Sequence, residues 1–455
     1  MSASRRLHLE TALLPGGWAD RVGVDIEAGT IRAVLPDVTA EGRELVAGIT
    51  LPGMPNLHSH TFQRGMAGLA ETRGPAGDSF WTWRQVMYGF LERLSPDDVQ
   101  ALATFAMVEM LESGFTSLAE FHYLHHAPDG RPYDDPAELC GRIAAAAADT
   151  GIGLTLLPVL YAQGGFGGAA PQPGQQRFLN TLDGYLRLHG AAASALAPVE
   201  DAVLGTAPHS LRAVGPDALH ALVAAVPGGP VHVHVAEQVR EVEDCLAWSG
   251  QRPVAWLLSH VPVGPRWCLI HATHMDLAET RGLAASGAVA GLCPVTEANL
   301  GDGVFPAPDF LAAGGRFGVG SDSNVDVSAP GELRMLEYSQ RLAHRARNVC
   351  AAGPGRSTGR SLFDAALEGG RQATGRRVGR IEAGSRADLV TLDRSHPALA
   401  GVSGDGWLDA WVFGAPGSLV RDVVVGGRAV VSGGRHHRRE TVAARCAAVM
   451  AGLVR

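Results

Sequence analysis

Lysine is absent from this chain of 455 residues, so every strongly basic side chain is an arginine. The 38 basic side chains face 46 acidic ones, which gives a net charge of −8 and a pI near 6.1. This balance provides no broad basic surface for nucleic acid or for an anionic membrane. We therefore expect a small-molecule substrate, and any anionic group on it must be held by individual arginines.

Closely spaced cysteines and long apolar runs are also missing. No Cys-x-x-Cys pair occurs, so we expect reduced, mostly buried thiols without disulfides. The six are Cys140, Cys245, Cys268, Cys293, Cys350 and Cys446. The N-terminal residues lack the apolar segment and cleavage site of a signal peptide, and no run approaches the roughly 18 apolar residues that span a membrane. These absences predict a cytoplasmic protein.

Both ends of the chain show the pattern of short strands. Residues 6–14 and 23–36 alternate apolar and polar side chains around Pro/Gly-rich turns, and the same character returns after about residue 383. Neither end has enough strands to bury a core alone, so we predict one small β-sandwich domain built from both termini. Its predicted halves are residues 1–50 and 383–455, with a catalytic domain at 51–382.

The middle of the chain alternates short apolar runs with helical stretches, which is typical of βα units. Eight such runs lie near residues 49–57, 116–121, 152–160, 203–208, 231–235, 267–271, 288–293 and 316–321. They predict an α/β fold, a (β/α)₈ TIM barrel. One helix between them is well marked, because Ser95 can cap it, Pro96 suits its first position and Gly114 ends it.

Polar residues stand at four of the predicted strand ends, where such a barrel carries its chemistry. These are His58 and His60 after the first strand, His234 after the fifth, His271 after the sixth and Asp322 after the eighth. A single histidine at a strand end is more often structural than a ligand. Together, however, His58, His60, His234 and Asp322 supply three nitrogens and one oxygen and leave a position for water, as in a catalytic zinc site.

Two residues near His234 are interpreted separately. His232 lies on the same face of the strand but one layer deeper, so we interpret it as a core or supporting residue. Glu237 follows three residues later and is a candidate for proton transfer. One complete ligand set predicts one divalent metal per chain, most simply Zn²⁺, although Fe²⁺ and Mn²⁺ tolerate the same ligands.

The pattern resembles the amidohydrolase superfamily, whose barrels carry His-x-His after strand one, histidines after strands five and six, and aspartate after strand eight. The resemblance covers nearly the whole chain, including residues 379–393, which in the superfamily re-enter the sandwich. HVAE at 234–237 is similar to the deaminase branch, in which one metal is used and the glutamate moves protons. The segment VLGTAPHS offers no lysine for carboxylation, so a two-metal site is not expected.

A finer resemblance is to the formimidoylglutamate deiminase family of histidine degradation. The segments on which this resemblance rests include HSHTFQRGMAGLAE (58–71), FWTWRQVMY (80–88), EFHYLHH (120–126), APHSLRAV (207–214) and CPVTEANLGDGVFP (293–306). The resemblance implies hydrolysis of N-formimidoyl-L-glutamate to N-formyl-L-glutamate and ammonia. It also implies that the substrate is held by Gln63, Arg84, Tyr123, His209 and Arg212.

The expected chemistry follows from the residue types. A zinc-bound water ionises near pH 7, and Asp322 and His271 can accept its proton. The amidine carbon is attacked, and Glu237 then protonates the nitrogen that leaves as ammonia. The Gly-rich segment 164–174 lacks the Gly-Lys-Ser/Thr of a phosphate loop and is expected to be a mobile lid.

Several alternatives stay open. The nearest is another single-metal deaminase of the superfamily acting on a nucleobase or nucleoside, which would need stacking and amide contacts rather than two cationic ones. A catalytically dead scaffold is a second alternative, against which all six reactive residues are present. Arg84 could be a stacked surface arginine. Large barrels often dimerise, so a homodimer is compatible with the sequence.

Overall fold

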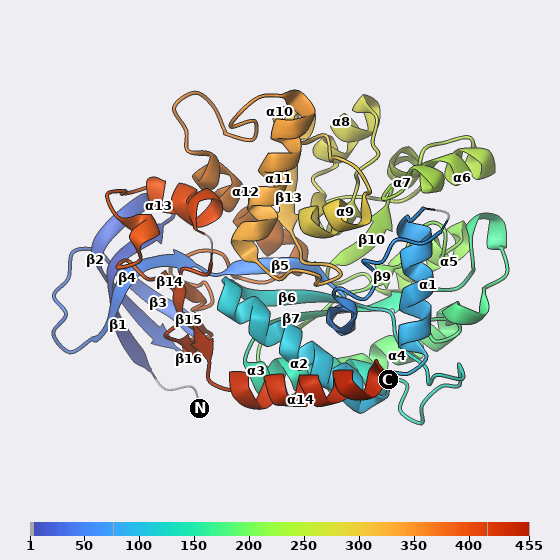
Figure 1. The fold of residues 1–455 in the computed structure, drawn as a ribbon, viewed down its shortest axis with the longest axis horizontal. Helices are drawn as coiled ribbons and strands as arrows, with labels where there is room; N and C mark the ends of the chain where they lie inside the picture. The colour runs from blue at the N-terminus through green and yellow to red at the C-terminus, as the bar shows by residue number, and fades with distance from the viewer. Residues whose placement is uncertain (1–3, 76, 416, 455) are drawn as a thin grey trace.

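The computed structural model describes residues 4–75, 77–415 and 417–454; residues 1–3, 76, 416 and 455, which include both ends of the predicted β domain, lie outside that part. Strands from both chain ends lie together at one end of the molecule (Figure 1). They form one sheet in the order β17-β16-β15-β14-β4-β1-β2-β3. Its strands are β1 (Arg5–Leu14), β2 (Gly17–Glu27), β3 (Thr30–Leu35), β4 (Glu44–Pro52), β14 (Leu389–Leu392), β15 (Val420–Val425), β16 (Arg428–Ser432) and β17 (Arg435–His436).

The two chain ends meet where β4 pairs with β14. These strands are antiparallel, with Leu51 opposite Val390, and β4 runs parallel to β1 on its other side. Apolar side chains of the N-terminal strands pack with Ile381, Ala387 and Leu389 into a core of their own. Strands from both chain ends therefore share one sheet and one core, which neither end could bury alone. The coarse prediction of a β domain from both termini is confirmed.

Parallel strands form two further sheets at the centre of the molecule. The first has the order β5-β6-β7-β8, with β9 pairing with β7, and the second has the order β10-β11-β12-β13. Isolated parallel bridges link the two sheets on both sides, Ser59 with Asp322 and Thr206 with Val231. The strands are β5 (Met54–Ser59), β6 (Phe115–His122), β7 (Gly153–Leu160), β8 (Val203–Leu204), β9 (Ala207–Pro208), β10 (Val231–Val235), β11 (Trp267–His271), β12 (Val289–Leu292) and β13 (Arg316–Val319).

Helices follow most of the central strands and pack outside them (Figure 1). The α-helices are α1 (Phe80–Leu91), α2 (Pro96–Ser113), α3 (Glu138–Thr150), α4 (Leu182–Ala195), α5 (Pro216–Ala225), α6 (Val239–Ser249), α7 (Pro253–His260), α8 (Leu277–Ser286), α9 (Pro294–Leu300), α10 (Ala307–Ala312), α11 (Ala329–His344), α12 (Thr358–Thr374), α13 (Gly406–Asp409) and α14 (Arg439–Leu453). Short helices of other types are η1 (Thr61–Met66), η2 (Phe166–Gly168), η3 (Pro173–Gln175), η4 (Pro397–Leu399) and η5 (Ala410–Gly414).

The predicted helix after Ser95 begins and ends as expected. The Ser95 hydroxyl accepts the Asp98 N–H, and the Asp98 carboxylate accepts the Ser95 N–H, which satisfies two free donors at the start of α2. Gly114 follows the last residue of α2 with a φ of 107°, a left-handed conformation that glycine adopts without strain.

The apolar run at 49–57 is not one strand, and this prediction was wrong. β4 ends at Pro52 in the terminal sheet, and β5 begins at Met54 in the first central sheet. Between them, Gly53 has no room for a side chain, since an added Cβ would lie 2.2 Å from Thr116 Oγ1. The chain therefore passes between two sheets at a single residue. The other seven predicted runs each contain a strand of the central sheets.

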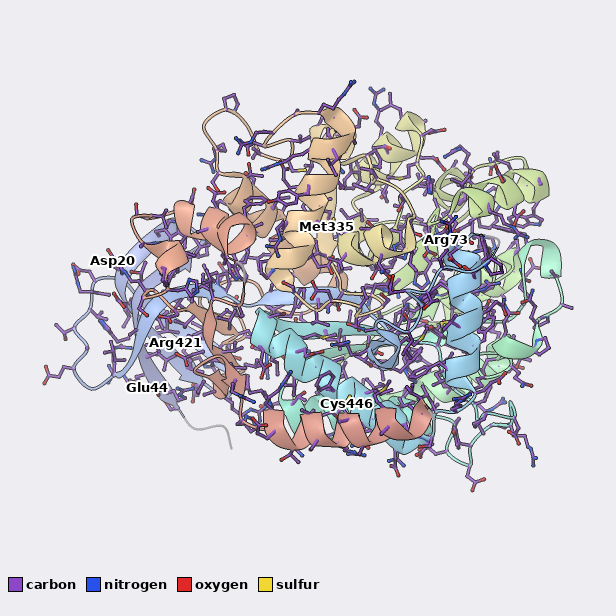
Figure 2. All side chains as sticks on the ribbon, in the orientation of Figure 1. Asp20, Glu44, Arg73, Met335, Arg421 and Cys446 are labelled. Atoms are coloured by element: carbon purple, nitrogen blue, oxygen red, sulfur yellow. The ribbon has the colours of Figure 1, made fainter. Side chains whose placement is uncertain are left out.

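All six cysteines are free and buried, in agreement with the sequence. Figure 2 labels Cys446 on α14, the C-terminal helix, which packs against α2. Burial raises the pKa of the Cys140 thiol to about 12, so this thiol stays protonated and unreactive at neutral pH. Among the described helices, none is both long and apolar enough to cross a membrane. The cytoplasmic location stays a prediction.

Candidate active site

The predicted site residues gather around one cavity at the carboxyl ends of the central strands. Every one of them lines this cavity except His58, whose side chain is fully buried beside His60 and His234. The strand ends supply the histidines and acids, while η1 and α1 bring Gln63 and Arg84 from the other side. Positions far apart in the chain are thus brought to one place, and their roles stay predictions.

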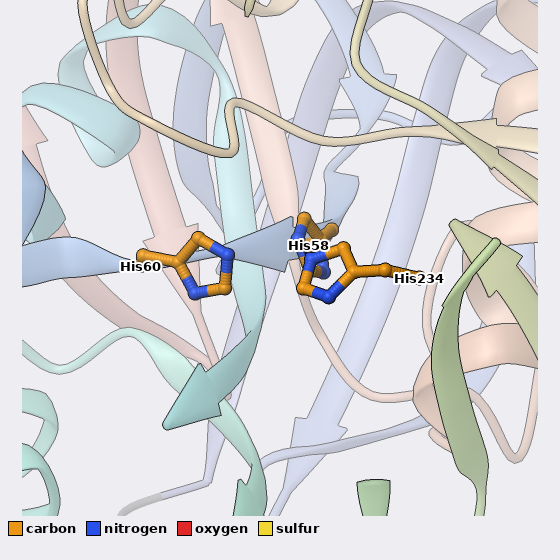
Figure 3. Close-up of side chains that lie close together, drawn as sticks. All are labelled: His58, His60 and His234. Carbon is orange, nitrogen blue, oxygen red and sulfur yellow. Dashed lines mark hydrogen bonds between the residues drawn. The ribbon is translucent and has the colours of Figure 1, made fainter. Parts of the chain in front are cut away.

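Three histidines converge on one side of the cavity (Figure 3). Nε2 of His58 lies 3.1 Å from Nε2 of His234, and the ligand atoms of these two rings and of His60 all lie within 4.8 Å of one another. His58 lies near the end of β5 and His60 directly after it, so their spacing of two turns both rings to one side. β10 brings His234 to the same point.

Backbone carbonyls fix the protonation of two of these rings. Nδ1 of His60 donates to Phe121 O at 2.8 Å, and Nδ1 of His234 donates to His209 O at 3.1 Å. Each Nε2 is then a bare lone pair directed into the cluster. Burial lowers the pKa of all three rings, that of His58 to about 3, and so keeps them neutral. Neutral imidazoles held in this way are the form that binds a metal.

Asp322 completes the cluster with a carboxylate. Its Oδ1 lies 3.4 Å from Nε2 of His58 and 3.3 Å from Nε2 of His60. Burial raises the pKa of Asp322, but the surrounding His58, His60 and His271 outweigh it and hold the pKa below its usual range. An ionised oxygen facing bare nitrogen lone pairs needs a cation between them. The residues present therefore fit a divalent metal with N/O ligands.

A buried polar network holds the ends of β5 and β13 together. Asn324 donates through Nδ2 to the carbonyls of His60 at 3.1 Å and Asp322 at 2.9 Å. Asp322 itself has a φ of 44°, a left-handed conformation that costs a non-glycine residue of order 1–3 kcal/mol. The Asn324 bonds stabilise this conformation and so set the direction of the Asp322 side chain.

Glu237 and His271 lie beside the histidine cluster, and His271 has three acids as neighbours. Nε2 of His271 is 3.9 Å from Glu237 Oε1 and 3.9 Å from Asp322 Oδ2, and its Nδ1 lies 3.2 Å from Glu297 Oε1. Burial lowers the pKa of His271, but the charges of Glu237, Glu297 and Asp322 outweigh it and raise the pKa to about 10. Burial raises the pKa of Glu237 to about 7. Both side chains can therefore hold a proton at neutral pH.

Two arginines line the same cavity. The guanidinium of Arg84 lies 4.7 Å from the centre of the Trp81 ring and 5.6 Å from that of Tyr88, and that of Arg212 lies 5.8 Å from Trp81. Within the described part, neither Nε finds a hydrogen-bond partner although both are buried. Arg84 is stacked on an aromatic ring, as the alternative of a stacked surface arginine expected, but it also lines the cavity. Both arginines retain donors for an anionic ligand.

The remaining predicted substrate residues are neutral hydrogen-bonding groups. Gln63 donates through Nε2 to the Tyr123 hydroxyl at 2.7 Å, and its Oε1 is buried without a partner among the described residues. His209 packs edge-on against Tyr161, with ring centres 4.6 Å apart. Burial, Arg212 and neighbouring histidines hold the pKa of His209 well below its usual range, so this ring is neutral.

Some site residues escaped the sequence reasoning. Glu297, which holds His271, and Glu241, which faces Arg212, are both buried acids on the helices that follow strands. His232 is a core residue, as interpreted, since its Nε2 bonds to Ala373 O at 2.8 Å. The predicted lid, residues 164–174, is fully described and contributes no side chain to the cavity, so its mobility stays a prediction.

A second group of potential ligands lies outside the cavity. His122, His125 and Cys140 have ligand atoms within 4.8 Å of one another and are all buried. Nε2 of His125 is already occupied by Val159 O at 2.9 Å. This group offers two nitrogens and one sulfur rather than the N/O set of the cavity.

Comparison with known proteins agrees with this geometry. Residues 49–430, well over half of the chain, match the profile of the Amidohydrolase family. The chain belongs to this family. It is 54% identical over 435 residues, 95% of each protein, to the formimidoylglutamate deiminase of Pseudomonas aeruginosa. The resemblance inferred from the sequence is thereby confirmed.

Solved structures share the fold of this amidohydrolase. A crystal structure of an amidohydrolase from Brucella melitensis has a TM-score of 0.95 and 53% identity, covering 99% of this chain and 100% of that one. An adenosine deaminase from Xanthomonas campestris, crystallised with bound zinc, has a TM-score of 0.81 and 22% identity, covering 99% and 98% of the two chains. The second likeness is one of fold alone.

Proposed function

We propose that this amidohydrolase hydrolyses N-formimidoyl-L-glutamate to N-formyl-L-glutamate and ammonia, a reaction of histidine degradation. The enzyme is a hydrolase that acts on a carbon–nitrogen bond, as its family membership and its 54% identical relative indicate. The observation that carries the substrate is the pair Arg84 and Arg212, which line the same cavity as the metal cluster. A dianion with a cationic end fits a cavity that is lined by both arginines and acids.

The finer architecture is part of the proposal. The two central sheets together form a closed (β/α)₈ barrel, which the bridges Ser59–Asp322 and Thr206–Val231 support. The proposed barrel domain begins after Gly53 and extends to residue 382, because β4 continues to Pro52 in the terminal sheet, and the proposed β domain is formed by the segments on either side. In a closed barrel the carboxyl ends of all strands meet, which accounts for ligands drawn from β5, β10 and the end of β13.

One divalent metal, Zn²⁺ in the first instance, would be held by His58, His60, His234 and Asp322. When bound, it would lower the pKa of a coordinated water to roughly 7 and so supply hydroxide at neutral pH. Nδ1 of His60 and of His234 are tied to backbone carbonyls, which keeps both rings oriented for this ion.

Proton transfer is assigned to the acids and the histidine beside the cluster. Oδ2 of Asp322 can take the proton from a water that attacks the amidine carbon, and Nε2 of His271, 3.9 Å from Oδ2, already carries a proton at neutral pH and can orient that water. Glu237, 3.9 Å from His271, delivers a proton to the nitrogen that leaves as ammonia. Glu297 orients His271 through Nδ1.

The glutamate part of the substrate faces the other wall. Arg84 and Arg212 are matched to its two carboxylates, and Gln63, Tyr123 and His209 complete the contacts with neutral donors and acceptors. N-formimidoylglycine lacks one carboxylate and would forgo a charge-assisted contact of about 1.5–3 kcal/mol. We expect its kcat/KM to be at least ten- to a hundredfold lower, at roughly 1.4 kcal/mol per decade.

The test is ammonia release from the purified enzyme, with N-formimidoyl-L-glutamate, N-formimidoylglycine, guanine, cytosine and adenosine assayed side by side. Formimidoylglutamate should be turned over fastest. Faster release from a nucleobase or nucleoside would overturn the substrate and leave a metal-dependent deaminase. Arg84→Leu and Arg212→Leu should raise KM for formimidoylglutamate while leaving the metal content unchanged.

A further inference from the structure

Glu241 is a fully buried carboxylate on α6 that lines no part of the cavity. It is the third residue of α6, and its side chain turns back toward the end of β10. Oε1 accepts the N–H of Ala236 at 3.1 Å, and Oε2 accepts the N–H of Glu237 at 3.2 Å. Its two oxygens thus bind the two residues between the strand and the helix cap.

The backbone that Glu241 holds is under strain. Ala236 has a φ of 52°, in the left-handed region that a residue with a Cβ seldom adopts. This conformation turns the chain out of β10 so that Glu237 faces His271 rather than continuing the strand. Hydrogen bonds to an ionised acceptor are about twice as strong as neutral ones, so the Glu241 carboxylate is well suited to stabilise the turn.

The same carboxylate faces an arginine of the cavity. Oε2 of Glu241 lies 3.9 Å from Nε of Arg212, and Nη2 of Arg212 lies 4.0 Å from Oε2 of Glu237. Arg212 therefore has two acids as neighbours, one behind it and one in the cavity. With Glu241 removed, the guanidinium would keep Glu237 as its only acidic partner, and the two would draw together.

We infer that Glu241 is a positioning residue that acts through both Glu237 and Arg212. It holds the turn that aims Glu237 at the departing nitrogen, and its charge holds Arg212 back from a closer ion pair with Glu237, whose Oε2 lies 4.0 Å from Nη2 of Arg212. This inference rests on the proposed function, in which Glu237 moves a proton and Arg212 binds a substrate carboxylate. Loss of Glu241 should therefore impair turnover and substrate binding together.

Two substitutions grade the effect. Glu241→Gln keeps one carbonyl oxygen for a backbone N–H but loses the charge, whereas Glu241→Ala loses both acceptors. On formimidoylglutamate, Glu241→Ala should lower kcat and raise KM by roughly ten- to a hundredfold each, the worth of one charged hydrogen bond. Glu241→Gln should lie between Glu241→Ala and the wild type.

Glu337 on α11 provides a matched control. It is equally buried and accepts two consecutive backbone N–H groups, those of Val349 and Cys350, at 2.9 Å each, as well as Nε of Arg341 at 2.7 Å. It contributes nothing to the cavity lining. Glu337→Ala should destabilise the fold while the folded enzyme keeps its wild-type kcat and KM.

The deciding experiment combines Glu241→Ala with a second change. In an Arg212→Ala background, removing Glu241 should change KM less than twofold, because Arg212, through which Glu241 acts on substrate binding, is already lost. In a Glu237→Gln background, removing Glu241 should change kcat less than twofold, because the proton carrier that Glu241 positions is already lost. Unchanged multiplicative losses in both backgrounds, or an effect equal to that of Glu337→Ala, would overturn the inference. A wild-type enzyme that releases no ammonia from formimidoylglutamate would instead overturn the proposed function.

Discussion

At the scale of single residues, Glu237 can be separated from the metal ligands by one substitution. Glu237→Gln keeps the volume and the carbonyl but cannot carry a proton. We expect kcat to fall by roughly 10²–10⁴, the usual worth of general acid–base catalysis, with the metal content unchanged. Steady-state ammonia release and elemental analysis of the same sample measure both quantities. Retention of most of the wild-type kcat would show that Glu237 is not the proton carrier.

Glu120 leads to a prediction about stability and pH. Its buried carboxyl accepts the Thr61 N–H at 2.9 Å and the Thr61 hydroxyl at 2.7 Å, next to His60. Burial raises its pKa to about 8, so the folded protein keeps this proton after the unfolded chain has lost it near pH 4.5. Between these values the folded state binds more protons, and stability falls as pH rises, by at most about 1.4 kcal/mol per unit.

Glu120→Gln replaces the titrating carboxyl by an amide, so residue 120 no longer binds a proton in either the folded or the unfolded state. The amide keeps an oxygen for Thr61. The free energy of unfolding in urea, measured at pH 5, 6, 7 and 8, should therefore fall less steeply in the variant than in the wild type. The variant should gain most, relative to the wild type, at pH 8. Parallel curves for the two proteins would contradict the raised pKa.

The residues that the sequence predicted and those it missed differ in a physical way. His58, His60, His234 and Asp322 were predictable because strand ends of parallel sheets share one edge, and their side chains are unusual there. Glu241 and Glu297 were not, because an acid in the first turn of a helix is common as a favourable partner of the helix dipole. Only the fold shows that the oxygens of Glu241 contact Arg212 and the turn after β10, and that Glu297 contacts His271.

At the scale of elements, Gly53 connects the terminal sheet with the central strands. An added Cβ would lie 2.2 Å from Oγ1 and 2.3 Å from Cγ2 of Thr116 on β6. Either the backbone at residue 53 or Thr116 must therefore shift. We expect Gly53→Ala to cost about 1–3 kcal/mol of unfolding free energy, as overpacking does. Gly16→Ala, at a turn with nothing within 4 Å of the added atom, should change stability little. Equal losses in both variants would contradict this account.

Elements were predictable where local rules decide them. The residues that begin and end α2 are its immediate neighbours in sequence, so Ser95, Pro96 and Gly114 predicted its bounds. The break at Gly53 depends on Thr116, which is distant in sequence, and an apolar run does not record which sheet each half joins. The same limit applies to the terminal sheet, whose pairing of β4 with β14 joins residues more than 300 apart.

At the scale of the whole molecule, the proposed metal ligands come from distant parts of the chain. His58 and His60 lie at the end of β5, His234 on β10 and Asp322 after β13. An ion bound here contacts all three regions only in the folded state, where burial keeps the three histidines neutral and the groups around Asp322 keep its carboxylate ionised. Metal binding should therefore be linked to global stability rather than to one loop.

Removal of the metal tests this linkage. Chelation should lower the free energy of unfolding, and added Zn²⁺ should restore it, by about 4 kcal/mol at a free concentration a thousandfold above Kd. Asp322→Ala should lose the metal and respond to neither treatment. Cys140→Ser alters the group of His122, His125 and Cys140 outside the cavity. This variant should keep one metal and the full response to chelation and to added Zn²⁺. Two metals per chain, both needed for ammonia release, would show that the cluster of His58, His60, His234 and Asp322 does not act alone.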